Sequence, residues 1–136
     1  MALDTEAAAK PTEKPVDNDK TKKTHTFRVS WRSPRGEMFE GTFSNHVISN
    51  AQRIQIGNAA ARYRGALPLD ALDDETRLLS TMIAHMTVSM PEESDRPDWA
   101  RNFGELMWPD LVQEIWKHVA EHEATFRGSG PDQKGG

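Results

Sequence analysis

Apolar and polar residues alternate in the first patterned part of the chain, residues 24–43. Every second residue of the run 24–31 is apolar from position 27 on, which is the period of a half-buried strand. The four residues 33–36, Ser-Pro-Arg-Gly, have the chemistry of a tight turn, and a second alternating run follows. The pattern predicts a β-hairpin with one aromatic face, made of Phe27, Val29, Trp31, Phe39 and Phe43. Helices or another subunit must cover that face, because two strands alone are marginally stable.

Beyond residue 43 the apolar spacing becomes helical, and we expect helices over about 50–63, 72–90, 99–107 and 109–127. Asn45 or Ser49 is expected to cap the first helix, and Asp70 or Asp73 the second. Gly57 lies in mid-run and can split the first helix. The segment 99–107 is either one short helix or an irregular apolar stretch. The last helix has Pro at its start and Gly just past its end.

These elements predict an α+β fold, an N-terminal β-hairpin followed by three to four helices, in a single domain over residues 24–128. The flanking segments 1–23 and 129–136 contain almost no large apolar side chain and are rich in Lys, Glu, Asp, Thr, Pro and Gly. Such segments bury too little surface to offset the entropy lost on ordering. We therefore expect a disordered N-terminal arm and a flexible C-terminal tail.

Charge is distributed unevenly along the 136 residues, whose net charge is −4. Residues 22–64 carry eight basic and two acidic residues, whereas residues 65–136 carry six basic and fourteen acidic ones. This asymmetry favours either a steered contact with a partner or an attraction between the two halves within one fold. The chain has no cysteine and no apolar run of membrane-spanning length, so we expect an intracellular protein outside the membrane.

One pattern points to catalysis, His118-x-x-Glu121-His122. Two histidines four residues apart lie on one face of a helix and are able to share a zinc ion, with the glutamate beside them as a base. Such a site needs a further carboxylate well downstream, and the remaining residues are a Gly- and Ser-containing tail. The other interpretation is structural, with His122 at the border of the core and His118 and Glu121 at the solvent edge. We predict no catalytic, cofactor-binding or metal-binding residue.

Seven residues are candidates for contact with a partner protein. Protein-binding surfaces often contain tryptophan, rows of methionine, and arginine without neighbouring acidic residues. Here two tryptophans flank the irregular segment, and the methionines and arginines lie on or next to predicted helices. A methionine stripe is more often part of an ordinary core. The candidates are Trp99, Trp108, Met82, Met86, Arg53, Arg62 and Arg64. Direct recognition of nucleic acid is not expected, because the chain has an acidic balance and no phosphate-binding loop.

The order of these features resembles that of small morphogenesis proteins of tailed bacteriophages, particularly the tail assembly chaperones. The residues that carry the resemblance are the hairpin F-x-V-x-W…G-x-x-F-x-G-x-F, the step Pro97-Asp98-Trp99 before the final helices, and His122-Glu123-Ala124-Thr125-Phe126 at the end of the last one. The resemblance covers Phe27 to Phe126.

The resemblance implies a non-enzymatic protein that shields the long helices of the tape-measure protein until the tube subunits polymerise. Its partners would be the tape-measure or tube protein, with a homo-oligomer also possible, and it would act in the host cytoplasm. The alternative within the same setting is a structural subunit retained in the virion. A small metalloenzyme using His118, Glu121 and His122 is the third hypothesis.

Overall fold

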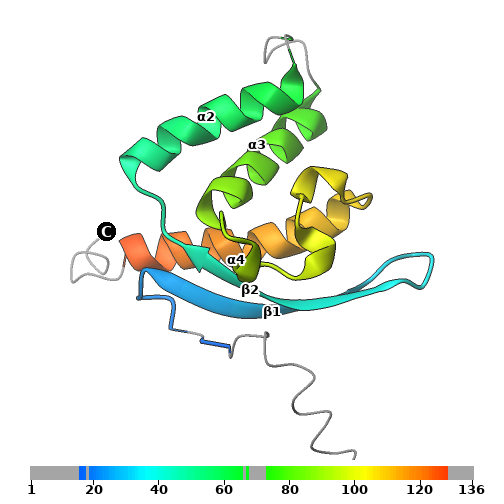
Figure 1. Ribbon diagram of the computed structural model, residues 1–136, viewed down its shortest axis with the longest axis horizontal. Helices are drawn as coiled ribbons and strands as arrows, with labels where there is room; N and C mark the ends of the chain where they lie inside the picture. The colour runs from blue at the N-terminus through cyan, green and yellow to red at the C-terminus, as the bar shows by residue number, and fades with distance from the viewer. Residues whose placement is uncertain (1–15, 18, 66, 68–72, 129–136) are drawn as a thin grey trace, which may run out of the picture.

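The computed structural model describes residues 16, 17, 19–65, 67 and 73–128 (Figure 1). Two antiparallel strands come first, followed by α-helices and a run of short 3-10 turns, which confirms the predicted α+β fold. The elements in chain order are β1 (Thr24–Arg32), β2 (Met38–His46), α2 (Asn50–Arg64), α3 (Asp74–Ser89), η2 (Glu93–Asp95), η3 (Asp98–Ala100), η4 (Phe103–Glu105) and α4 (Pro109–Arg127).

The hairpin pairs β1 with β2 so that Phe27 lies opposite Phe43 and Trp31 opposite Phe39. Its turn is fixed by Ser33, whose backbone N–H donates to Glu37 at 2.8 Å and whose carbonyl accepts from Gly36 at 2.9 Å. Gly36 has a φ of 91°, a region that side-chain-bearing residues rarely adopt. The second strand continues to His46, three residues beyond the expected end at 43.

The helix ends follow from local hydrogen bonding. Ser49 forms a complete capping box with Gln52 at the start of α2, and the Asp73 side chain accepts from the backbone N–H of Thr76 at the start of α3. Gly57 does not interrupt α2. The other candidate cap of α3, Asp70, lies outside the described residues.

Of the two alternatives for residues 99–107, the single short helix is wrong and the irregular apolar stretch is found, because the chain there forms two separate 3-10 turns, η3 and η4. Asn102 lies between them and accepts from the backbone N–H of Gly104, which closes a local turn instead of continuing a helix. At the far end, Pro109 restricts Trp108 to an extended conformation, with φ −112° and ψ 111°. The apolar residues of the segment are therefore presented from an irregular backbone.

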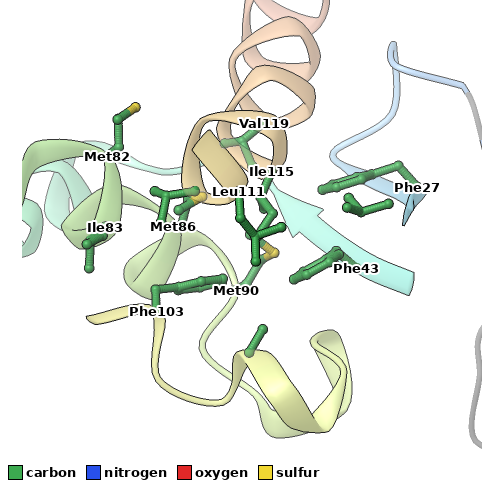
Figure 2. Close-up of a cluster of buried hydrophobic side chains, with 13 residues drawn as sticks. Phe27, Phe43, Met82, Ile83, Met86, Met90, Phe103, Leu111, Ile115 and Val119 are labelled. Atoms are coloured by element: carbon green, nitrogen blue, oxygen red, sulfur yellow. The ribbon is translucent and has the colours of Figure 1, made fainter. Parts of the chain in front are cut away.

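The helices form successive layers on one face of the hairpin. Figure 1 shows α4 running along the hairpin, α3 crossing next to it, and α2 as the outermost helix. The main core lies between the hairpin, α3, α4 and the 3-10 turns, and Figure 2 shows how its side chains converge. Its buried members are Phe27, Val29, Phe43, Met82, Ile83, Met86, Met90, Ala100, Phe103, Leu111, Val112, Ile115 and Val119.

A second, smaller core lies between α2 and α3. It consists of Ile48, Ile56, Ala59, Ala60 and Ala84, with Val88 packed against it. Tyr63 adds a contact with η4, because a methyl group on Gly104 would lie 2.7 Å from the Tyr63 ring. The outermost helix is thus held mainly by small side chains.

Part of the segment expected to be a disordered arm, residues 1–23, belongs to the fold. Asp17 exchanges two backbone hydrogen bonds with Thr26 of β1, at 2.9 and 3.2 Å, and the Lys23 carbonyl accepts from Val47 at 2.9 Å. The missed signal was polar: Asp17 and Asp19 accept hydrogen bonds from backbone N–H groups two residues ahead, which stabilises turns without apolar burial. Residues 1–15 and 129–136 lie outside the described part.

Candidate functional site: an aromatic ledge on the hairpin

Four large aromatic side chains lie side by side near the turn end of the hairpin and are only partly buried. Trp31 is 6.1 Å from Phe39 and 6.3 Å from Trp108, measured between ring centroids. Phe39 is 5.3 Å from Trp99, which meets it nearly edge-on. These distances are within the range of favourable ring contacts. We call Trp31, Phe39, Trp99 and Trp108 the aromatic ledge.

The ledge comes from three different parts of the chain. Trp31 and Phe39 are cross-strand partners, Trp108 precedes the first residue of α4, and Trp99 belongs to η3. Trp99 is fixed by a hydrogen bond from its Nε1 to the Glu40 carbonyl at 2.9 Å. A rigid placement of this kind reduces the entropy lost when a partner binds.

The backbone of β2 is also in close contact with the segment that carries Trp99. A methyl group on Gly41 would lie 2.6 Å from both Cβ and Cγ of Pro97 and 3.5 Å from Trp99 Nε1. Only glycine permits Pro97 to approach so closely. Gly41 therefore helps to set the position of Trp99 in the ledge.

The ledge is incompletely covered because the helices are offset along the hairpin, away from its turn (Figure 1). Figure 1 shows the turn end of the hairpin reaching past the N-terminal end of α4. Met107, next to Trp108 in the chain, is 81% exposed. Exposed methionine beside partly buried tryptophan is a combination found at protein-binding surfaces.

The structure separates the seven residues predicted to contact a partner. Trp99 and Trp108 both lie in the ledge. Arg53 and Arg62 are exposed on α2, on the other side of α3, and nothing is described of the Arg64 side chain. The predicted residues therefore do not form one surface.

Met82 and Met86 are buried in the main core, where Figure 2 shows them on α3 among its apolar side chains. They are not presented to a partner in this structure, which corrects their interpretation as an adaptable surface. The reason is that the C-terminal half of α3, from Ser80 on, is buried on most of its circumference, so its methionines fill the space between neighbouring elements.

The two histidines of the His-x-x-Glu-His pattern do not converge on a common point. His122 uses both ring nitrogens, since Nε2 donates to the Lys22 carbonyl at 2.7 Å and Nδ1 accepts from Asn45 Nδ2 at 2.9 Å. His118 instead stacks on Phe27, with ring centroids 4.5 Å apart. Among the described residues, no group of three His, Asp or Glu side chains has an arrangement able to hold a metal ion. The geometry therefore gives the structural interpretation of the pattern.

Burial changes the charge behaviour of this region. Burial, together with the nearby His122, Lys20 and His118, lowers the pKa of His25 from 6.5 to about 4. Burial likewise lowers the pKa of His118 and of His122, against the raising effect of Glu114 on the former and of the hydrogen bond with Lys22 on the latter. Neutral imidazoles are thus favoured at the open end of the hairpin, opposite the turn.

Sequence reasoning missed two residues of the aromatic ledge, Trp31 and Phe39, and the neighbouring Met107. The alternation placed Trp31 and Phe39 on the apolar face, which we expected helices or another subunit to cover. A usable signal was their position next to the predicted turn, because the distal residues of a hairpin are the last to be covered by helices. Met107 had no signal, since apolar spacing does not report how an irregular segment is oriented.

What the ledge offers chemically is a rigid apolar and aromatic contact surface.

Among the described residues, no helix is both long and apolar enough to cross a membrane. Comparison of the chain with protein-family models, curated proteins and solved structures finds no match. The functional argument therefore depends on the geometry of this chain and on the resemblance of its sequence pattern.

Proposed function

We propose that the protein is a non-enzymatic assembly chaperone of a bacteriophage tail, which shields apolar helices of the tape-measure protein until the tube subunits polymerise. The observation that supports the proposal is the aromatic ledge, with Met107 beside it. Surfaces of tryptophan, phenylalanine and methionine bind apolar helix faces, and rigid aromatic anchors contribute most of the binding energy at such interfaces.

The ledge is suited to reversible binding. Its four rings are each partly buried by their neighbours, so the uncomplexed protein exposes only part of their area to water. A partner helix gains contact with the remaining area and with Met107. A chaperone needs this balance, since it must stay dispersed when free and release its client during assembly.

Two methionines provide a matched pair of variants for a test. Met107 adjoins the ledge and is 81% exposed, whereas Met38 is 47% exposed and alternates onto the opposite face of the hairpin. Tagged protein expressed during phage propagation is purified, and the tape-measure protein is quantified by mass spectrometry. We expect Met107→Glu to reduce its recovery at least tenfold and Met38→Glu to leave it unchanged.

Equal recovery with both variants, or no tape-measure protein with the unaltered chain, contradicts the proposal. Finished particles are examined in the same experiment. A chaperone is absent from them, while a structural subunit retained in the virion is present in a fixed ratio to the tube protein. Stoichiometric presence would therefore favour the alternative structural role.

A further inference from the structure

Exposed carboxylates border the aromatic ledge on the side formed by the 3-10 turns and α4. Asp98 directly precedes Trp99 in η3, and its side chain is 97% exposed. Glu105, two residues before Met107, and Asp110, in the first turn of α4, are exposed as well. Because consecutive Cα atoms are 3.8 Å apart, the Cα atom of each acidic residue is within about 8 Å of that of a ledge residue or of Met107. This side of the ledge therefore carries three negative charges at its border.

The basic residues of the two strands lie on the other face of the hairpin. Side chains alternate between the two faces of a strand, so Arg28 and Arg32 lie on the face opposite to Trp31. On that face Arg28 Nη2 is 3.5 Å from Glu40 Oε1, and the Arg32 guanidinium donates to the Gly36 carbonyl at 3.3 Å. The positive charge of the hairpin strands is thus directed away from the ledge.

Two arginines of the 3-10 region are close to the ledge in the chain, and both interact with groups of the domain itself. Arg96 is half-buried over the ring of Phe103, with its guanidinium carbon 4.8 Å from the ring centroid. Arg101 is exposed, and its guanidinium nitrogens lie 3.6 Å from a carboxylate oxygen of Glu93 and 3.6 Å from one of Asp98. Neither arginine offsets the carboxylates of Glu105 and Asp110.

The remaining charges near the ledge nearly cancel. The hairpin turn contributes one exposed charge of each sign, Arg35 and Glu37. The N-terminal end of α4 adds about half of a positive charge. Within the described part of the chain, the three carboxylates beside the 3-10 turns and α4 therefore exceed the positive charges next to them. The border of the ledge is net negative.

We propose that the ledge selects amphipathic helices whose apolar face is flanked by lysine or arginine, an inference that rests on the chaperone function proposed above and names the class of client segment. The apolar face of such a helix covers the ledge rings and Met107, and its basic flanks reach the carboxylates at the border. Long Lys and Arg side chains extend along apolar surface while their charged ends stay in water. Exposed ion pairs of this kind add selectivity and association rate more than affinity.

Two synthetic peptides test the proposal on the full chain. Both are about 18 residues long, enough to form a helix, and share one leucine and alanine face. One has lysine on its polar face and the other has glutamate. Affinity is measured by fluorescence anisotropy of a dye on the peptide. In about 0.1 M NaCl we expect the lysine peptide to bind about tenfold more tightly. In about 1 M NaCl the preference should fall to about twofold or less, because the Debye length shrinks from about 10 Å to about 3 Å.

A matched pair of variants locates the effect. Glu105→Lys reverses one charge at the ledge border, and Glu121→Lys makes the same change at an exposed position about 18 Å along α4 from Pro109. We expect Glu105→Lys to reduce the preference for the lysine peptide about threefold and Glu121→Lys to change it by less than about 1.5-fold. Asp98→Lys is a second border variant with the same expected effect. Circular dichroism checks that each variant is folded.

Equal affinity for the two peptides, or an equal response to Glu105→Lys and Glu121→Lys, overturns the inference about charge and leaves the ledge as a binding surface. Binding of neither peptide contradicts the chaperone function as well. Analytical ultracentrifugation of the free protein shows whether a second copy of the chain occupies the ledge. A dimer that excludes both peptides and that Met107→Glu dissociates also overturns the inference.

Discussion

The two ends of the β-hairpin are built from the same alternation of aromatic and polar residues, but they have different surroundings. At the open end, Phe27 and Phe43 are fully enclosed by α3, α4 and the 3-10 turns. At the turn end, Trp31 and Phe39 are only partly covered, by Trp99 and Trp108. The same pattern therefore produces a core at one end and an accessible surface at the other.

The difference arises from the position of the helices along the hairpin (Figure 1). Both strands have nine residues, and the helices packed on them cover the open end. Trp99 and Trp108 then cover part of the turn end, where smaller apolar residues would leave the strands bare. We infer that the open end stabilises the domain and that the turn end binds the partner.

The largest expected effect is the loss of a ring from the open end. Phe43→Ala should lower the free energy of unfolding by about 3–5 kcal/mol, because it leaves a cavity in the closed core. Phe39→Ala should cost about 1–2 kcal/mol, since part of its area is already in contact with water. Urea denaturation followed by tryptophan fluorescence measures both, and equal losses would remove the distinction between the two ends.

Acid should also act on the open end, where the buried histidines lie. The pKa of His25 is lowered from 6.5 to about 4 in the folded state, so the unfolded chain binds more protons between these values. The contribution of neutral His25 to the free energy of unfolding is therefore fully present above pH 6.5. It falls as the pH drops towards 4, by up to about 3 kcal/mol. Urea midpoints at pH 7.5 and 4.5 test this. His25→Phe should reduce the difference between them, and an unreduced difference would assign it to other groups.

A smaller effect is expected where the two ends meet, at Gly41. Gly41→Ala brings a methyl group to 2.6 Å from Pro97, which should cost about 1–3 kcal/mol and displace Trp99. Gly57→Ala is the matched control, since a methyl group there meets nothing within 4 Å and lies inside α2. The control should be stabilised by about 0.5–1 kcal/mol. A neutral Gly41→Ala would show that Pro97 moves freely.

The smallest effect on stability is expected at the ledge itself. Met107→Glu changes a side chain outside the core, so its free energy of unfolding should remain within about 0.5 kcal/mol of the unaltered protein. Thermal unfolding monitored by circular dichroism checks this. A larger loss would mean that Met107 supports the fold, and its binding defect would then no longer report on the ledge.

The sequence predicted the elements whose signals are local. The alternation defined the hairpin, Ser49 and Asp73 marked two helix starts, and Pro109 marked the third. The sequence left residues 99–107 open between a helix and an irregular stretch, because Asn102 and Gly104 set the backbone there against the apolar spacing. The residues of the candidate site were only partly found, since exposure of Trp31 depends on where α4 begins relative to the hairpin turn. His25 was missed because a period-two pattern does not distinguish a buried polar ring from the strand boundary.

The role assigned to the ledge is tested most directly by site-specific photo-crosslinking. A benzophenone amino acid replaces Met107 in one protein and Met38 in another, and cells producing phage are irradiated during tail assembly. The account predicts a covalent product with the tape-measure protein from position 107 and none from position 38. Products of equal yield from both positions, or a product from position 38 alone, would contradict it.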